Sequence, residues 1–188
     1  MKKEVLELKI ANIKELLFEK SFLQLFTEEL IKNKLSLLQR SDRFNDATDK
    51  SGNRYEIKGT VVRDKGDNYR TNKSTYTCEQ ISSFMNNSTY FLNINKNICS
   101  YARSKEVRFV SIFNKFEFSK FDIFIGVVYF DDVIKIVSFT RDELISTGKT
   151  SRQFSDDVFS LSLDRNNIME FIESGLVLTL KYEDIFSE

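Results

Sequence analysis

The stretch of this chain with the clearest chemical potential is residues 45–58, Asn-Asp-Ala-Thr-Asp-Lys-Ser-Gly-Asn-Arg-Tyr-Glu-Ile-Lys. It predicts two short strands on either side of a Ser51-Gly52-Asn53 turn. A hairpin centred near Ser51 places Asp46 opposite Glu56, with Cβ atoms about 5 Å apart. Lys58 follows Glu56 by two residues, so strand alternation puts both on one face of the sheet. Two carboxylates and an ammonium would converge there, which suits binding of a divalent cation and activation of a water for attack on phosphorus.

Asp46 followed by Glu56-Ile57-Lys58 resembles the D…(D/E)-x-K signature of the restriction-endonuclease-like nucleases. The family motif often begins Pro-Asp, whereas Asn45 precedes the aspartate here. The resemblance, most like a small type II restriction endonuclease, implies an α/β (α+β) fold with a mixed central β-sheet flanked by helices. It also implies Mg²⁺, which Mn²⁺ can replace, held by Asp46, Glu56 and the main-chain carbonyl of Ile57. Lys58 would orient or help to deprotonate the attacking water, and cleavage would leave a 5′-phosphate and a 3′-hydroxyl.

A helix, continuous or with one break, is predicted ahead of this motif over residues 12–39. Leucines recur at every seventh position from Leu16 to Leu37 and define its core-facing side. Glu19 lies within this apolar stripe, where an unpaired carboxylate would be costly. Two interpretations stay open: Glu19 pairs with a lysine at the edge of the stripe, or, as the resemblance implies, it supplies an acidic ligand to the metal site. Glu29 is the second candidate for that role.

A polar segment, residues 63–76, follows the second strand and carries four basic groups and two tyrosines. Its position predicts DNA contacts, in which basic side chains meet phosphates and Arg or Asn side chains reach base edges. A merely solvated loop is the alternative. The candidate DNA-binding residues are Arg63, Lys65, Arg70, Asn72, Lys73 and Gln80. Gln80 has a second interpretation, because together with Thr77 it fits a capping box at the start of a helix over 78–87.

The rest of the chain predicts mainly strands of high apolar density, which are typical of strands buried on both faces. These strands are expected at 90–94, 107–113, 121–130 and 133–139, with an Asp131-Asp132 turn joining the last two, and at 176–182. Between them we expect a short helix over 140–146, an irregular polar segment over 147–160 and a helix from Asp164 to about Glu173. The whole chain, 1–188, is expected to be a single nuclease domain, with an N-terminal helical region (5–40) and a catalytic core from about residue 41 to 188.

The composition excludes several kinds of chemistry. The chain has no histidine, which removes Ser-His-Asp and Cys-His catalysis and histidine-based metal sites. Equal numbers of basic and acidic residues argue against a non-specific DNA coat protein, although local phosphate contacts need no net charge. Two cysteines, short apolar runs and no signal-peptide pattern at the N-terminus predict a cytoplasmic protein that does not associate with membranes.

These observations lead to one principal function hypothesis and two alternatives. The first is a Mg²⁺-dependent, site-specific double-stranded DNA endonuclease of the type II restriction class. Such an enzyme would be a homodimer whose two-fold symmetry matches a palindromic site, and a cognate DNA methyltransferase acting on that site is a further implied partner. The alternatives are a repair, resolvase or mobile-element nuclease with the same fold, and a non-catalytic DNA-binding domain. A charged hairpin in an unrelated α/β protein is the remaining possibility.

Overall fold

The computed structural model describes residues 3–39, 46–62, 75–86, 111–148, 150–153, 155–163 and 167–186. Its helices are α1 (Lys3–Leu16), α2 (Lys20–Leu35), α3 (Cys78–Asn86), α6 (Arg141–Ser146) and α7 (Ile168–Glu173), with 3-10 turns η1 (Phe118–Lys120) and η2 (Tyr182–Phe186). Its strands are β1 (Leu38–Gln39), β2 (Ala47–Thr48), β3 (Arg54–Val61), β4 (Ser111–Glu117), β5 (Ile123–Tyr129), β6 (Val133–Thr140), β7 (Thr150–Gln153), β8 (Ser155–Leu163) and β9 (Leu176–Lys181).

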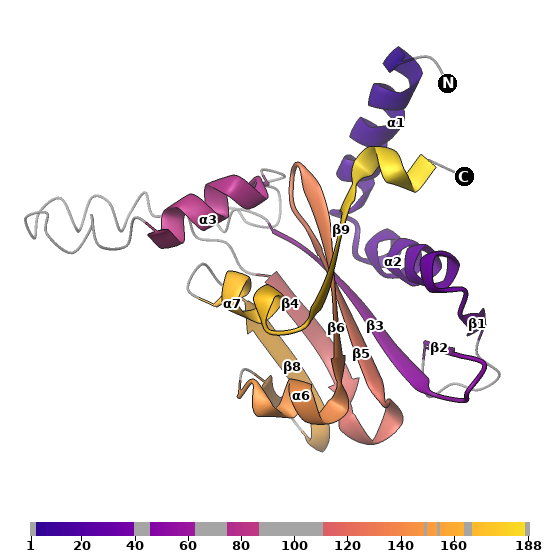
Figure 1. The fold of residues 1–188 in the computed structure, drawn as a ribbon, viewed down its shortest axis with the longest axis vertical. Helices are drawn as coiled ribbons and strands as arrows, with labels where there is room; N and C mark the ends of the chain where they lie inside the picture. Colours follow the sequence, from indigo (N-terminus) through magenta and orange to yellow (C-terminus); the bar gives the residue numbers. More distant parts are fainter. Residues whose placement is uncertain are drawn as a thin grey trace, which may run out of the picture.

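A six-stranded mixed sheet with the order β1-β2-β3-β5-β6-β9 forms the centre of the molecule (Figure 1). β3 and β5 are parallel, and the other neighbouring strands are antiparallel. β5 is buried from Phe124 to its end, as its continuous apolar run predicts. The expected mixed α/β architecture, with a central sheet and flanking helices, is therefore confirmed.

The two faces of this sheet pack against different layers, because successive strand residues point to opposite sides. On one face, Ile57 of β3 packs with Leu23 and Ile31 of α2. On the other face, Phe124 and Phe139 pack with aromatic residues of a second, three-stranded sheet with the order β4-β8-β7 and with α7. Figure 1 shows α2 on one side of the main sheet, and β4, β8, α6 and α7 on the other.

Gly59 allows α2 to approach β3 closely. A β-carbon at this position would collide with the hydroxyl oxygen of Thr27 and lie 3.2 Å from Leu23 Cδ1. The Thr27 hydroxyl cannot easily move aside, because it donates to the Leu23 carbonyl at 2.6 Å and lies 2.9 Å from the hydroxyl of buried Tyr129. This contact therefore fixes how closely α2 packs against β3.

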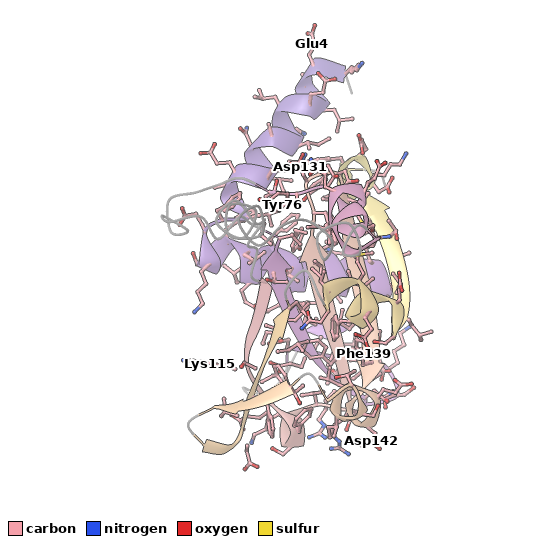
Figure 2. All side chains as sticks on the ribbon, turned by 90° about the vertical axis from the view of Figure 1, so that its left-hand side faces the viewer. Glu4, Tyr76, Lys115, Asp131, Phe139 and Asp142 are labelled. Atoms are coloured by element: carbon pink, nitrogen blue, oxygen red, sulfur yellow. The ribbon has the colours of Figure 1, made fainter. Side chains whose placement is uncertain are left out.

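The N-terminal helical region begins earlier than the helix predicted over 12–39, and it contains the one break that the prediction allowed. α1 begins at Lys3 and ends at Leu16, and α2 starts at Lys20, so the helical region is broken at Leu17–Glu19. Leu17 is fully buried at this break. α1 itself has no buried residue and projects from the body, with Glu4 near its tip (Figure 2).

The polar segment 147–160 is not irregular, so that prediction is wrong. β7 and β8 occupy most of it and form the second sheet with β4. The overlooked signal is the period-two alternation of Phe159, Leu161 and Leu163 with serines, which places those three side chains in the core.

Other predicted elements are confirmed or shifted by a few residues. Asp131 and Asp132 join β5 to β6 as a hairpin, and Thr140 begins α6 with a complete capping box. β4 begins at 111 within its described part, the N-cap of α7 is Asn167, and the last strand ends at Lys181. The strand predicted at 90–94 and the cap predicted at Asp164 lie outside the described residues. None of the helices that the structure describes is both long and apolar enough to cross a membrane.

Candidate active site

The hairpin of β2 and β3 has the predicted register. Ala47 lies opposite Tyr55, and the Asp46 N–H donates to the Tyr55 carbonyl at 2.9 Å, so Asp46 lies opposite Glu56. The turn is set by Asp49, whose carboxylate accepts the N–H groups of Ser51 and Asn53, each at 2.9 Å. Such aspartate-centred turns form locally, which explains why the sequence predicts this hairpin well.

Asp46, Glu56 and Lys58 converge as expected. The Lys58 ammonium Nζ lies 2.5 Å from Glu56 Oε1 and 3.3 Å from Asp46 Oδ2. Asp46 Oδ2 also accepts the N–H of Ile57 at 2.8 Å, which holds the carboxylate against β3. All three side chains are largely buried, so these charges interact in a poorly solvated environment.

α2 supplies two further polar groups at this edge of β3. The Gln24 side-chain amide donates to the Ile57 carbonyl at 3.0 Å and to Glu28 Oε1 at 2.7 Å. Glu28 is close enough to act electrostatically on Glu56, and it also pairs with Lys32 at 3.6 Å. The carbonyl of Ile57, an expected metal ligand, is therefore accessible to side chains of the preceding helix.

The acidic residue that α2 places near the cluster is Glu28. The two residues predicted for that position, Glu19 and Glu29, lie elsewhere. Glu19 is the exposed N-cap residue of α2, because the helix break removes it from the buried stripe; its predicted burial is wrong. Glu29 is exposed and pairs with Lys32 at 3.5 Å. The signal that would have found Glu28 is the i, i+4 spacing of Gln24, Glu28 and Lys32, a polar row beside the apolar stripe.

The electrostatics of the cluster are dominated by burial. Burial raises the pKa of Glu56 to about 7; the Lys58 ammonium opposes this rise, and the carboxylates of Asp46 and Glu28 add to it. Burial alone would lower the pKa of Lys58, but the Glu56 and Asp46 carboxylates outweigh it and raise this pKa above its ordinary value. Lys58 therefore stays charged near neutral pH. It is suited to orienting a water or stabilising negative charge, and poorly suited to accepting a proton.

The donor set fits a hard cation such as Mg²⁺. Two carboxylates and a main-chain carbonyl are oxygen ligands, and Mg²⁺ commonly uses one or two carboxylates while keeping several waters. The described residues contain no group of three or more acidic or cysteine side chains arranged to hold a metal. The protein's share of a coordination sphere would thus be Asp46, Glu56 and the Ile57 carbonyl, and a cation would compete with Lys58 for the carboxylates.

Most predicted DNA-binding residues cannot be placed. Arg63, Lys65, Arg70, Asn72 and Lys73 lie outside the described residues. Gln80 is described and forms the capping box with Thr77: Gln80 Oε1 accepts the Thr77 N–H at 2.8 Å, and Thr77 Oγ1 accepts the Gln80 N–H at 3.1 Å. The capping interpretation of Gln80 is therefore confirmed, and its side chain is already engaged within α3.

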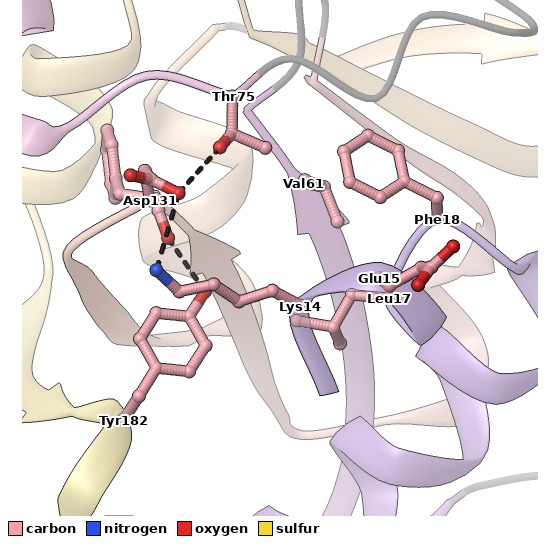
Figure 3. Close-up of a pocket in the computed structure, with 9 residues that line it drawn as sticks. Lys14, Glu15, Leu17, Phe18, Val61, Thr75, Asp131 and Tyr182 are labelled. Atoms are coloured by element: carbon pink, nitrogen blue, oxygen red, sulfur yellow. Dashed lines mark hydrogen bonds and ion pairs between the residues drawn. The ribbon is translucent and has the colours of Figure 1, made fainter. Parts of the chain in front are cut away.

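A cavity of about 260 Å³ lies elsewhere, at the junction of α1, the end of β3 and the β5–β6 turn (Figure 3). It is lined by Val61 of β3, whose side chain points to the face opposite Glu56. Three of its polar side chains contact one another, since Asp131 accepts from Lys14 at 3.4 Å and from Thr75 at 3.0 Å. Lys14 also sits 4.9 Å from the centre of the Tyr182 ring. The titratable cluster at Asp46, rather than this cavity, is the candidate active site.

No protein-family model matches the chain, and no curated protein matches its sequence. The function of this chain is therefore inferred from its own residues and their geometry.

Proposed function

We propose that this chain is a Mg²⁺-dependent endonuclease of double-stranded DNA, with a restriction-endonuclease-like fold and, within that class, a type II restriction enzyme. One observation carries the proposal: the ammonium of Lys58 is held between the carboxylates of Asp46 and Glu56, beside the carbonyl of Ile57. The mixed sheet flanked by helices is compatible with the expected fold class.

Each group of the cluster has a role in this proposal. Asp46, Glu56 and the Ile57 carbonyl would hold the cation, and Glu28 lies on the adjoining helix, where its charge strengthens the attraction for it. A bound Mg²⁺ would polarise the phosphate and lower the pKa of a nearby water. Lys58 would orient the attacking water and stabilise the charge that builds on the phosphate oxygens. In-line attack would break the bond to the 3′ oxygen and leave a 5′-phosphate and a 3′-hydroxyl.

The first test is incubation of the purified protein with plasmid and phage DNA in the presence of Mg²⁺, Mn²⁺ or EDTA. Discrete, metal-dependent fragments are expected, and mapping their ends would give the recognition site. A smear would instead favour a repair or mobile-element nuclease, and cleavage confined to branched DNA would favour a resolvase. No cleavage of linear, circular or branched DNA with either metal would contradict the nuclease proposal and leave a DNA-binding domain.

The site assignment is tested separately with Asp46→Ala and Lys58→Ala. Each is expected to reduce cleavage on the order of 10²–10³-fold, because each removes a group that acts on the transition state. Glu29→Gln is the matched control, since Glu29 is an exposed acid of α2. Circular dichroism would verify that each variant folds. Parent-like cleavage by either alanine variant would show that the site lies elsewhere.

A further inference from the structure

β9 forms one edge of the main sheet and exposes apolar side chains. Leu176, Val177 and Leu178 are 81%, 43% and 46% exposed. The strand runs along the right-hand margin of the molecule in Figure 2 and, among the described strands, pairs only with β6. Natural sheet edges usually carry charges, prolines or bulges that block further pairing. Residues 176–180, Leu-Val-Leu-Thr-Leu, have none of these.

The hydrogen-bonding pattern shows which main-chain groups face the open edge. The Phe130 N–H donates to the Val133 carbonyl, so main-chain groups of Val133 face β5. Because strand residues alternate, those of Ile134 and Ile136 face β9 and meet Leu180 and Leu178. Val177 and Thr179 must then direct their N–H and C=O groups away from β6. The next residue in this series, Lys181, agrees with this, since its N–H donates to an Asp184 carboxylate oxygen at 2.8 Å.

We propose that a second copy of this chain pairs with β9 through its own β9, antiparallel, with a two-fold axis at Leu178. In this register Val177 faces Thr179 of the second copy, and Thr179 faces its Val177. The outward N–H and C=O groups of both strands are then satisfied as hydrogen-bonded pairs. The same strand supplies both sides of the contact, as a two-fold interface requires.

The side chains are complementary in this register as well. Leu176, Leu178 and Leu180 lie on the sheet face that carries Ile134 and Ile136, because residues opposite one another share a face. Pairing about Leu178 sets Leu178 against itself and Leu176 against Leu180 of the second copy, which gives a continuous apolar ladder. Lys181 falls opposite Gly175, so no like charges are opposed within the paired segment. This proposal does not depend on the proposed nuclease activity, because it is tested by the molar mass of the protein in solution.

The oligomeric state of the full chain is measured by light scattering after size-exclusion chromatography, over a range of concentrations. The parent is expected to have twice the mass of one chain. Leu178→Lys places two ammonium groups at the two-fold axis and is expected to weaken self-association roughly 100-fold or more. Its side chain is already half-exposed, so the folded monomer should tolerate it, which circular dichroism would verify. Leu8→Lys, at a 63% exposed leucine of projecting α1, is the matched control and should leave the dimer intact.

Cysteine cross-linking tests the register. In a Cys78→Ser/Cys99→Ser background, Leu178→Cys should form an intermolecular disulfide under mild oxidation, since Cα atoms in a non-hydrogen-bonded pair lie about 4.5 Å apart. Leu176→Cys should not, because its two copies would be four residues out of register, roughly 14 Å apart. A parent that is monomeric at every concentration would overturn the proposal. So would a dimer that Leu8→Lys dissociates and Leu178→Lys does not, or one cross-linked through position 176 alone.

Discussion

Glu56 is the residue of the site whose ionised form is most strongly disfavoured by its surroundings. Its carboxyl is buried next to Phe124 of β5, and another carboxylate, Asp46, lies opposite it. Its pKa is raised from 4.5 to about 7, so the folded state binds this proton more tightly than the unfolded state does. Between these two values the free energy of unfolding therefore falls as the pH rises. The cluster is held together at a stability penalty, as expected of groups arranged to bind a ligand.

Glu56→Gln should relieve this penalty. The neutral amide has nearly the same shape, so we expect the variant to exceed the parent in stability by about 1–3 kcal/mol near pH 8 and by little near pH 4.5. Urea unfolding at both pH values, without divalent cations, measures the difference. Glu29→Gln, at an exposed position, should show no such pH-dependent gain. An equal gain for Glu56→Gln at both pH values would contradict the raised pKa.

Glu28→Gln tests the contribution of α2 to the site. Glutamine at this position can keep a hydrogen bond to Gln24 while it removes the charge that acts on Glu56. The pKa of Glu56 should fall, which moves the acid limb of the cleavage profile to lower pH, and the apparent affinity for Mg²⁺ should drop about tenfold because one negative charge near the cation is lost. Glu29→Gln should change neither quantity. Identical profiles for the two variants would exclude a role of Glu28.

At the scale of helices and strands, local sequence patterns were enough to predict some elements and not others. The β2–β3 hairpin, its register and the α3 capping box follow from residues a few positions apart, and all three were predictable. One break in the N-terminal helix was allowed for but could not be located, because the apolar repeat continues through Leu17–Glu19 and the burial of Leu17 depends on tertiary packing. Because the break takes Glu19 out of the buried stripe, Glu19 does not reach the cluster, and Glu28 of α2 lies near it instead.

The packing of α2 on β3 gives a prediction for Gly59. Gly59→Ala would push a β-carbon into the Thr27 hydroxyl, so we expect a loss of about 1–3 kcal/mol in stability and lower cleavage, because α2 carries Gln24 and Glu28. Urea unfolding and the cleavage assay measure both effects. Thr27→Ala removes the colliding oxygen, so the double variant should lose less than the two single variants combined. Additive losses would show that the helix is not held at this contact.

At the scale of the whole molecule, the order of the strands in the main sheet could not be predicted from the sequence. β3 pairs in parallel with β5, more than sixty residues later, and β9 returns to the far edge beside β6. Such pairings depend on which apolar faces bury one another, and local periodicity does not specify that. The continuous apolar run of β5 predicted that both of its faces are buried. It did not predict that β3 pairs with β5 in parallel while β6 pairs with it antiparallel. The charge cluster was predictable although the sheet order was not, because its three members lie within one hairpin.

Cation binding should change the stability of the entire chain, since a ligand that binds only the folded state stabilises it by mass action. Free Mg²⁺ at about 100 times its dissociation constant would add about 2.7 kcal/mol, measurable as a rise in the melting temperature. The rise should be smaller near pH 6 than near pH 8, because a proton on Glu56 competes with the cation below its pKa of about 7. Asp46→Asn removes one carboxylate charge from the cluster and should abolish most of the rise, whereas Glu29→Gln should preserve it. If Asp46→Asn keeps the full pH-dependent rise, the cation binds elsewhere on the molecule and the metal assignment at β3 is wrong.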